Sequence, residues 1–243
     1  MDPELYHLHH LNYLEDLPYW LALADQARDL DPAGPILELG CGTGRVMQFL
    51  RAEGVRVCGL DFDRQMLAYL KEKDPSATVF LADMTNFSLG HHFPLILLPC
   101  NTYSTLSAPQ RKATLECVNA HLLPGGCFAA SLPNPADLIR MGDSEESGVE
   151  ETFIHPGTQA PVQVSSSWKT IGGTVTIYWH YDLLQEDGTV QRTTHEISHR
   201  LDPAEIYLEE VRQAGFDFIA HGEFNQTPYH PEADFLIIEA RKK

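Results

Sequence analysis

The chain has 243 residues, and its 17 lysines and arginines stand against 34 aspartates and glutamates, for a formal net charge of −17. This charge disfavours nucleic acids and anionic membranes as partners, and no apolar run approaches the ~20 residues that cross a bilayer. Five cysteines without C-x-x-C spacing indicate free thiols rather than disulfides or zinc ligands. We therefore expect a cytoplasmic protein without a metal, folded as one domain with an insertion.

Residues 1–34 form an N-terminal helical segment in this interpretation. Its helix begins near Pro18, which suits a first turn, and continues with apolar residues at helical spacing. The histidines at positions 7, 9 and 10 are expected to be solvated, because no cysteine or carboxylate nearby completes a set of metal ligands.

The most informative stretch is 35–45, which reads Pro-Ile-Leu-Glu-Leu-Gly-Cys-Gly-Thr-Gly-Arg. The pattern predicts a buried strand, a glycine turn and the start of a helix, where backbone N–H groups can approach a ligand closely. A dinucleotide site requires a small residue at position 45, where this chain has Arg45, and a P-loop requires a lysine that is absent. The turn therefore indicates a cofactor other than NAD or a nucleoside triphosphate.

A second apolar run, 55–60, ends in Asp61. This acid follows Gly40 by about 20 residues, the spacing at which a carboxylate at a strand end holds a ribose diol. The alternative is that Asp61 only caps the next helix, but Asp63 is better placed for that role. With the helical pattern over 45–53 between the two runs, the unit is βαβ.

Three more apolar runs, 78–82, 95–98 and 127–132, continue the alternation of strand and helix. Polar residues follow the third and the fourth run directly. Open α/β sheets bind ligands at the carboxyl ends of their strands, so these residues should converge on one crevice.

The pattern E-x-G-x-G-x-G, in which Glu38 precedes Gly40 by two residues, resembles the first motif of class I S-adenosylmethionine-dependent methyltransferases. The resemblance extends from about Leu14 to Lys243 and is strongest to the branch that acts on small molecules. It implies a Rossmann-like, doubly wound α/β fold whose seven-stranded sheet is mostly parallel, with the last strand antiparallel. It also implies S-adenosyl-L-methionine as the cofactor.

The resemblance implies a role for each residue at the strand ends. Asp83 would contact the exocyclic amine of adenine, with Met84 and Phe62 against the two faces of the ring. Asn101 and Tyr103 would shape the methyl-transfer site. The residues expected to bind the cofactor are Glu38, Gly40, Cys41, Gly42, Asp61, Phe62, Asp83, Met84, Pro99 and Tyr13.

The dipeptide Pro99-Cys100 also resembles the nucleophile of cytosine-C5 DNA methyltransferases. DNA binding would require clustered lysines and arginines, which this acidic chain lacks. A buried thiol is the favoured interpretation of Cys100.

After the fifth strand, 134 to about 160 is expected to be irregular, and then the period changes to two. The runs 162–171, 174–184 and 189–201 are joined by Gly-Gly and Asp-Gly, which predicts a three-stranded antiparallel meander. Its apolar face would pack on the core or on a second subunit of a homodimer. Three of its histidines are candidate bases for a phenol or acid acceptor: His180, His195 and His199.

The C-terminal part returns to helix and strand. Asp202 is expected to cap a helix over 203–214, which Gly215 ends, and strands follow at 216–224 and 234–241. The predicted division is an N-terminal segment over the cofactor, 1–34, a cofactor-binding core, 35–133 with 201–243, and an inserted sheet, 134–200, that contacts substrate or a second subunit.

These observations predict a methyltransferase that moves a methyl group by in-line displacement to a nitrogen or oxygen of a small molecule. A sulfonium methyl is already activated, so the protein mainly aligns the nucleophile and excludes water. The alternative is a catalytically silent protein that binds the same cofactor as a sensor or partner subunit. The pocket residues fit both hypotheses, and only turnover separates them.

Overall fold

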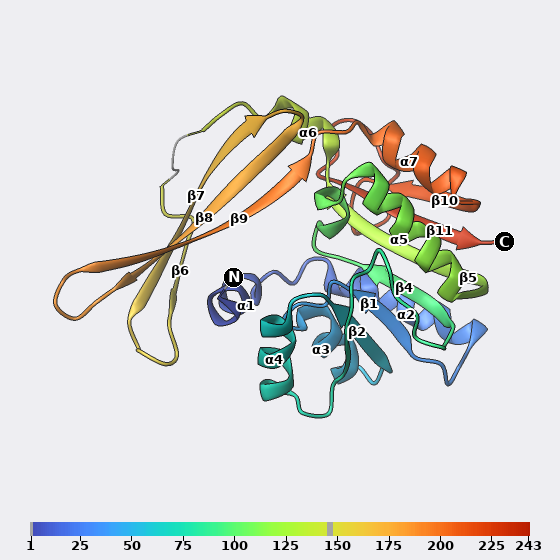
Figure 1. Ribbon diagram of the computed structural model, residues 1–243, viewed down its shortest axis with the longest axis horizontal. Helices are drawn as coiled ribbons and strands as arrows, with labels where there is room; N and C mark the ends of the chain where they lie inside the picture. Colours follow the sequence, from blue (N-terminus) through green and yellow to red (C-terminus); the bar gives the residue numbers. More distant parts are fainter. Residues whose placement is uncertain (1, 145–147) are drawn as a thin grey trace.

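Two β-sheets make up the frame of the protein in the computed structural model, which describes residues 2–144 and 148–243 (Figure 1). One has seven strands in the order β10-β11-β5-β4-β1-β2-β3, and the other has four in the order β6-β7-β8-β9. Strands β1 to β5 pair in parallel, whereas β11 runs antiparallel to both its neighbours. This confirms the predicted fold class. The strands of the larger sheet are β1 (Ile36–Leu39), β2 (Val57–Asp61), β3 (Thr78–Leu81), β4 (Phe93–Leu98), β5 (Leu122–Pro133), β10 (Phe216–His221) and β11 (Phe235–Lys242).

Helices cover both faces of the seven-stranded sheet, and β1 and β4 are therefore buried along their whole length. One buried cluster joins the sheet to α2, α3 and α4, and a second joins it to α5 and α7. None of the helices in the described residues has the length and apolar character that a membrane crossing requires. These helices are α2 (Leu17–Leu30), α3 (Arg45–Ala52), α4 (Arg64–Lys73), α5 (Ala108–His121) and α7 (Ala204–Gln213).

One of the two predicted helix caps is confirmed, and a further cap is present at Ser107. Asp63 Oδ1 accepts from the N–H of Gln65 at 2.8 Å at the start of α4, and Ser107 precedes α5 in a capping box. The predicted cap at Asp202 was wrong, because Pro203 occupies the N-cap of α7. Asp202 instead accepts from Arg111 Nη2 at 2.8 Å, since a fully buried guanidinium requires carboxylate partners.

The inserted sheet stands beside the core and reaches away from it (Figure 1). The predicted hairpin turn is confirmed at Gly172 and Gly173, whose φ angles of 58° and 77° suit a tight turn. The expectation of an irregular segment before it was wrong, because α6 and β6 form there and β6 pairs with β7 as a fourth strand. Four residues are too few to display a period of two in the sequence. The elements are α6 (Pro135–Arg140), β6 (Glu151–Ile154), β7 (Pro161–Ile171), β8 (Thr174–Leu184) and β9 (Val190–Arg200).

Two short helices connect the inserted sheet to the core. Helix α1 (Pro3–His10) begins where Asp2 Oδ1 accepts from the N–H of Glu4 at 2.9 Å, and its Leu5 packs against the apolar side of the inserted sheet. The 3₁₀-helix η1 (Thr102–Thr105) follows β4 and contacts β9. The inserted sheet therefore meets the core at two separate points.

Candidate functional site

The turn after β1 has the backbone geometry that its glycines predict. Gly40, Gly42 and Gly44 have φ angles of 63°, 53° and 87°. A Cβ on Gly44 would lie 2.6 Å from a methyl group of Leu70, so this position also requires glycine for close packing. The turn lies at the amino end of α3, where helical N–H groups have no partner within the helix and favour electron-rich ligands.

Glu38 lies in β1 beneath the turn and is only 2% exposed. The N–H of Met47 donates to its carboxylate, but Oε2 has no hydrogen-bond partner among the described residues. Burial raises the pKa of Glu38 to about 8, and the Arg45 guanidinium partly offsets this rise. A buried carboxylate with a free oxygen is suited to bind a cation such as an ammonium group.

Asp61 ends β2 and holds the glycine turn from the other side. Its Oδ2 accepts from the N–H of Gly42 at 2.7 Å, and its Oδ1 accepts from the N–H of Asp63 at 2.8 Å. Burial raises the pKa of Asp61, although these two N–H groups act in the opposite direction. The N–H of Phe62 is a third donor to this carboxylate, which has about four acceptor sites, so Asp61 can still receive a hydroxyl donor. Phe62 follows with 74% of its surface exposed and is free to cover a ring.

Asp83 and Met84, the two residues that follow β3 and Ala82, lie in different environments. Met84 is buried, and its methyl group would lie 3.5 Å from a Cβ on Gly40, so it packs against the turn. Asp83 is exposed, and its Oδ1 accepts from the N–H and the hydroxyl of Thr85, both at 2.8 Å. The proposed adenine contacts of both residues stay predictions.

The chain after β4 and Pro99 has an unusual backbone. Cys100 and Asn101 have φ angles of 58° and 62°, a region that residues other than glycine rarely adopt and that often marks functional sites. Asn101 thus lies at the carboxyl end of β4, as expected. Tyr103 is fully buried instead, and its ring contacts Phe128 and Tyr207 in the core. Its position favours a packing role, and the catalytic roles of both residues stay predictions.

Arg45 is a residue of this site that the sequence analysis did not assign to it. Its guanidinium donates to both carboxylate oxygens of Asp16 at 2.7 and 2.6 Å, to the carbonyl of Tyr13 at 2.6 Å and to Cys100 Sγ at 3.1 Å. The carbon at its centre lies 5.2 Å from the centroid of the Tyr13 ring. Arg45 therefore ties the N-terminal segment to the glycine turn and to the end of β4. No short-range pattern could reveal contacts between residues so far apart in the sequence.

Helix α1 forms a wall of the site. The ring of Tyr6 would lie 3.9 Å from a Cβ on Gly42, and His7 Nδ1 lies 3.1 Å from Thr43 Oγ1 in the same turn. His10 stacks on Tyr6 with ring centroids 4.2 Å apart. Burial lowers the pKa of His10 to about 4, so this ring is neutral near pH 7.

The cysteines beside the turn are inert in this arrangement. Burial raises the pKa of Cys100 to about 11, although Arg45 acts in the opposite direction, and burial also raises the pKa of Cys41. Both thiols are therefore protonated near pH 7, which disfavours a nucleophilic Cys100. Within residues 2–144 and 148–243, no group of three or more metal-ligating side chains could hold a metal ion.

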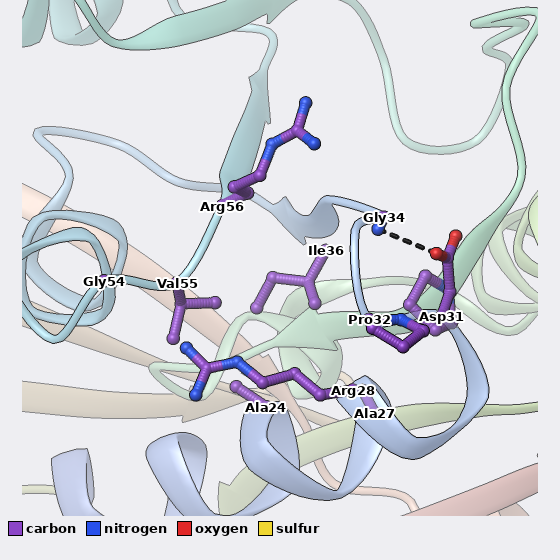
Figure 2. A pocket seen from close by; sticks show the side chains of 11 residues that line it. Ala24, Ala27, Arg28, Asp31, Pro32, Gly34, Ile36, Gly54, Val55 and Arg56 are labelled. Carbon is purple, nitrogen blue, oxygen red and sulfur yellow. Dashed lines mark hydrogen bonds between the residues drawn. The ribbon is translucent and has the colours of Figure 1, made fainter.

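A small cavity of about 90 Å³ lies between α2 and the start of β1 (Figure 2). Arg28, Ile36 and Arg56 line it, and Asp31 Oδ1 accepts from the N–H of Gly34 at 2.8 Å beside it. It lies at the amino end of β1, whereas the glycine turn follows the carboxyl end. This cavity is therefore separate from the candidate site.

Comparisons with known proteins agree with this geometry. Residues 36–126 match the methyltransferase domain family. The cypemycin N-terminal methyltransferase of a Streptomyces species is 32% identical over 209 residues, which cover 84% of this chain and 81% of that protein. The chain belongs to the class I S-adenosylmethionine-dependent methyltransferases. A second relative, the dTDP-3-amino-3,6-dideoxy-alpha-D-glucopyranose N,N-dimethyltransferase of Streptomyces fradiae, is 29% identical over 82% of this chain and 76% of its own.

Solved structures share the fold of this methyltransferase. A S-adenosylmethionine-dependent methyltransferase from Clostridium acetobutylicum superposes with a TM-score of 0.81 at 15% identity, over 98% of this chain and 97% of that one. The SAM-bound amino pentose methyltransferase from Micromonospora echinaspora gives 0.76 at 19% identity, over 98% and 96%. The cofactor of this methyltransferase is S-adenosylmethionine.

The residues of the site fit this cofactor. The free, buried Oε2 of Glu38 can accept a hydrogen bond from the ammonium group in the methionine part of the cofactor. The N–H groups of the glycine turn directly follow β1, the strand that carries Glu38. Asp61 has a lone pair left for a ribose hydroxyl. The assignment of each cofactor-binding residue stays a prediction, since it rests on this chain's geometry alone.

Proposed function

We propose that this methyltransferase methylates the amino nitrogen of a small molecule. S-adenosylmethionine supplies the activated methyl group and leaves as a neutral thioether. In this proposal Glu38 and Asp61 hold the cofactor, and the end of β4 at Asn101 borders the site of transfer. The inserted sheet, 134–200, binds the acceptor over the core formed by 35–133 and 201–243, while 1–34 closes the cofactor site.

One observation carries the choice of nitrogen over a carboxylate oxygen. The face of the inserted sheet that meets α1 and η1 presents aromatic, aliphatic, imidazole and uncharged polar side chains together with Glu151 of β6, and strand alternation places Lys169, Arg192 and Arg200 on the opposite face. A carboxylate acceptor would therefore find no lysine or arginine of β7–β9 to pair with on this face. An amine needs hydrogen-bond acceptors and apolar contacts, which this face provides.

The names of the relatives include both kinds of acceptor. Two act on amino groups, of a dTDP-amino sugar and of a peptide amino terminus. Another relative, 25% identical over 85% of this chain, is the trans-aconitate 2-methyltransferase of Delftia acidovorans. The charge pattern of the inserted sheet favours the first kind for this chain.

The test is turnover on a small panel. The protein is incubated with S-adenosylmethionine and a dTDP-3-amino sugar, a short peptide with a free amino terminus, or trans-aconitate, and S-adenosylhomocysteine is measured by mass spectrometry. We expect product with an amine and none with trans-aconitate. Product with trans-aconitate alone would contradict the proposal. Saturable cofactor binding without product from any acceptor would favour the silent binding protein.

We also propose a cytoplasmic location and a homodimer for this methyltransferase. The five cysteines are all free, which fits a reducing cytoplasm. A homodimer through the inserted sheet stays a prediction, which sedimentation analysis would test.

A further inference from the structure

One face of the inserted sheet contacts α1 at one end and η1 at the other. On β8 it carries Val175, Ile177, Trp179 and Tyr181, and on β9 the residue opposite Val175 is His199. At one end of this face, His9 Nδ1 lies 2.9 Å from the hydroxyl of Tyr181. At the other end, His199 meets η1. We call this surface, between α1 and η1, the acceptor face.

His199 is held by a short chain of hydrogen bonds from the core. Ser104 Oγ, in η1, donates to the carbonyl of Asn101 at 2.8 Å and lies 2.8 Å from His199 Nδ1. A serine has one hydroxyl hydrogen, and we assign it to the contact with the Asn101 carbonyl, because a carbonyl can only accept. Ser104 therefore accepts from His199, so the ring hydrogen is on Nδ1 and the lone pair of the neutral ring is on Nε2.

The free nitrogen of this ring is accessible. Among the described residues, no hydrogen bond reaches His199 Nε2, and it is not one of the buried side-chain atoms that lack a partner. The residue as a whole is 4% exposed, so little of it is open to solvent. Nε2 is therefore the part of His199 that a bound molecule can reach. Burial lowers the pKa of His199 to about 4, so its lone pair is available near pH 7.

The same short helix links His199 to the cofactor turn. Thr102, at the start of η1, would lie 3.5 Å from a Cβ on Gly40, and Ser104 is two residues further along. The strained Cys100–Asn101 backbone fixes the point at which η1 leaves β4. Gly40 and His199 thus lie on two sides of one rigid connector.

We propose that His199 Nε2 accepts a hydrogen bond from the acceptor's N–H and thereby orients that nitrogen for methyl transfer. The inference rests on the proposed function. An amine must turn its lone pair toward the methyl carbon, and a fixed partner for its N–H selects that orientation. The N–C bond forms as the S–C bond breaks, and the nitrogen's proton then passes to water. So weak a base as His199 does not remove the proton of an ammonium, which makes it an orienting residue rather than a general base.

The other histidines of the sheet serve as comparisons. His195 Nε2 already accepts from the N–H of Asp2 at 3.1 Å. The ring nitrogens of His180 lie 3.0 Å from Ser167 Oγ and from Thr194 Oγ1, on the opposite face. Nε2 of His195 is thus engaged by the N-terminal segment, and both ring nitrogens of His180 have partners, which makes His180 the matched control.

Three variants test the proposal: His199→Leu, His199→Gln and His180→Leu. With the amine that the wild type methylates, we expect His199→Leu to lower kcat/KM by about 100-fold, the effect of losing alignment, with unchanged affinity for S-adenosylhomocysteine. Because the side-chain oxygen of glutamine also accepts a hydrogen bond, His199→Gln should stay within about 10-fold of wild type. His180→Leu should behave as wild type. Wild-type activity in His199→Leu, or equal loss in the Gln and Leu variants, would overturn the proposal.

A spectroscopic measurement decides the ring state without turnover. Long-range ¹H–¹⁵N spectra of the histidines at pH 7, assigned by the signal lost in His199→Gln, should show His199 neutral with its hydrogen on Nδ1. A hydrogen on Nε2, or a charged ring, would contradict the inference. A wild type that binds S-adenosylhomocysteine but methylates no amine would refute the proposed function, while this spectrum would still report on His199.

Discussion

The two sheets of this methyltransferase present different chemistry at the places where they meet. At the strand ends of the seven-stranded sheet lie carboxylates, glycine N–H groups and the buried pair of Arg45 and Asp16, whose side chains are 9% and 1% exposed. The acceptor face of the four-stranded sheet has mainly rings, methyl groups and uncharged polar side chains, and its titratable groups are histidines, tyrosine and Glu151 of β6. A cofactor that carries an ammonium and a diol needs the first kind of surface. We therefore propose that the core binds the cofactor and that the insertion selects the acceptor.

The largest expected effect is a loss of stability when the buried pair of Arg45 and Asp16 in the core is broken. Asp16→Asn leaves the buried Arg45 guanidinium without its carboxylate, which should cost about 3–5 kcal/mol of the free energy of unfolding. Urea unfolding followed by circular dichroism measures this. Asp25→Asn is the control, because Asp25 pairs with Arg28 at an exposed site and should lose at most about 1 kcal/mol. Equal losses in the two variants would contradict a buried, rigid anchor at Arg45.

A second effect depends on pH. The folded protein raises the pKa of Glu38 to about 8 from its usual 4.5, so without cofactor the folded state holds a proton that the unfolded state releases. The contribution of Glu38 to the free energy of unfolding therefore falls as the pH rises from about 4.5 to 8. Glu38→Gln should remove this fall, stabilise the cofactor-free protein by about 1–3 kcal/mol at pH 8, and weaken S-adenosylhomocysteine binding. Thermal unfolding from pH 5 to 8 measures the first effect. Equal pH slopes in variant and wild type would contradict a buried, unpaired carboxylate.

A third test separates the two sheets directly. Asp61→Asn should weaken S-adenosylhomocysteine binding by about 1–3 kcal/mol, because a charged hydrogen-bond acceptor is lost. Trp179→Ala, on the acceptor face, should leave that affinity unchanged and raise KM for the amine. Calorimetry and steady-state kinetics measure the two constants. Unchanged affinity in Asp61→Asn would remove Asp61 from the cofactor site.

The smallest effect concerns the thiol beside Arg45. Cys100→Ala removes a weak acceptor and a few packing contacts, so methyl transfer should stay within about 2-fold of wild type. Initial rates at saturating cofactor measure this. Abolished turnover with normal cofactor binding would restore the nucleophile hypothesis for Cys100.

The predictable parts of the molecule are those with local signals. The glycines after β1, the cap at Asp63 and the Gly172–Gly173 turn each follow from a few neighbouring residues, because the backbone conformation at those points depends on them. The resemblance carried by Glu38 and the glycines then supplied the fold and the cofactor.

The unpredicted parts depend on contacts between distant residues. Arg45 finds Asp16 only once α2 and α3 pack together, and Ser104 meets His199 only after the insertion folds back on η1. The residues next to Asp202 in the sequence predicted that it caps a helix. In the structure Asp202 instead accepts a hydrogen bond from the buried guanidinium of Arg111. Tertiary packing overrides local preference at such positions.

The most direct test is a crystal structure of the protein with S-adenosylhomocysteine bound. The account predicts that the amino group of the ligand lies within hydrogen-bond distance of Glu38 Oε2 and that its ribose hydroxyls contact Asp61. A ligand bound elsewhere, or a glycine turn occupied by protein side chains while the ligand is bound, would contradict the account.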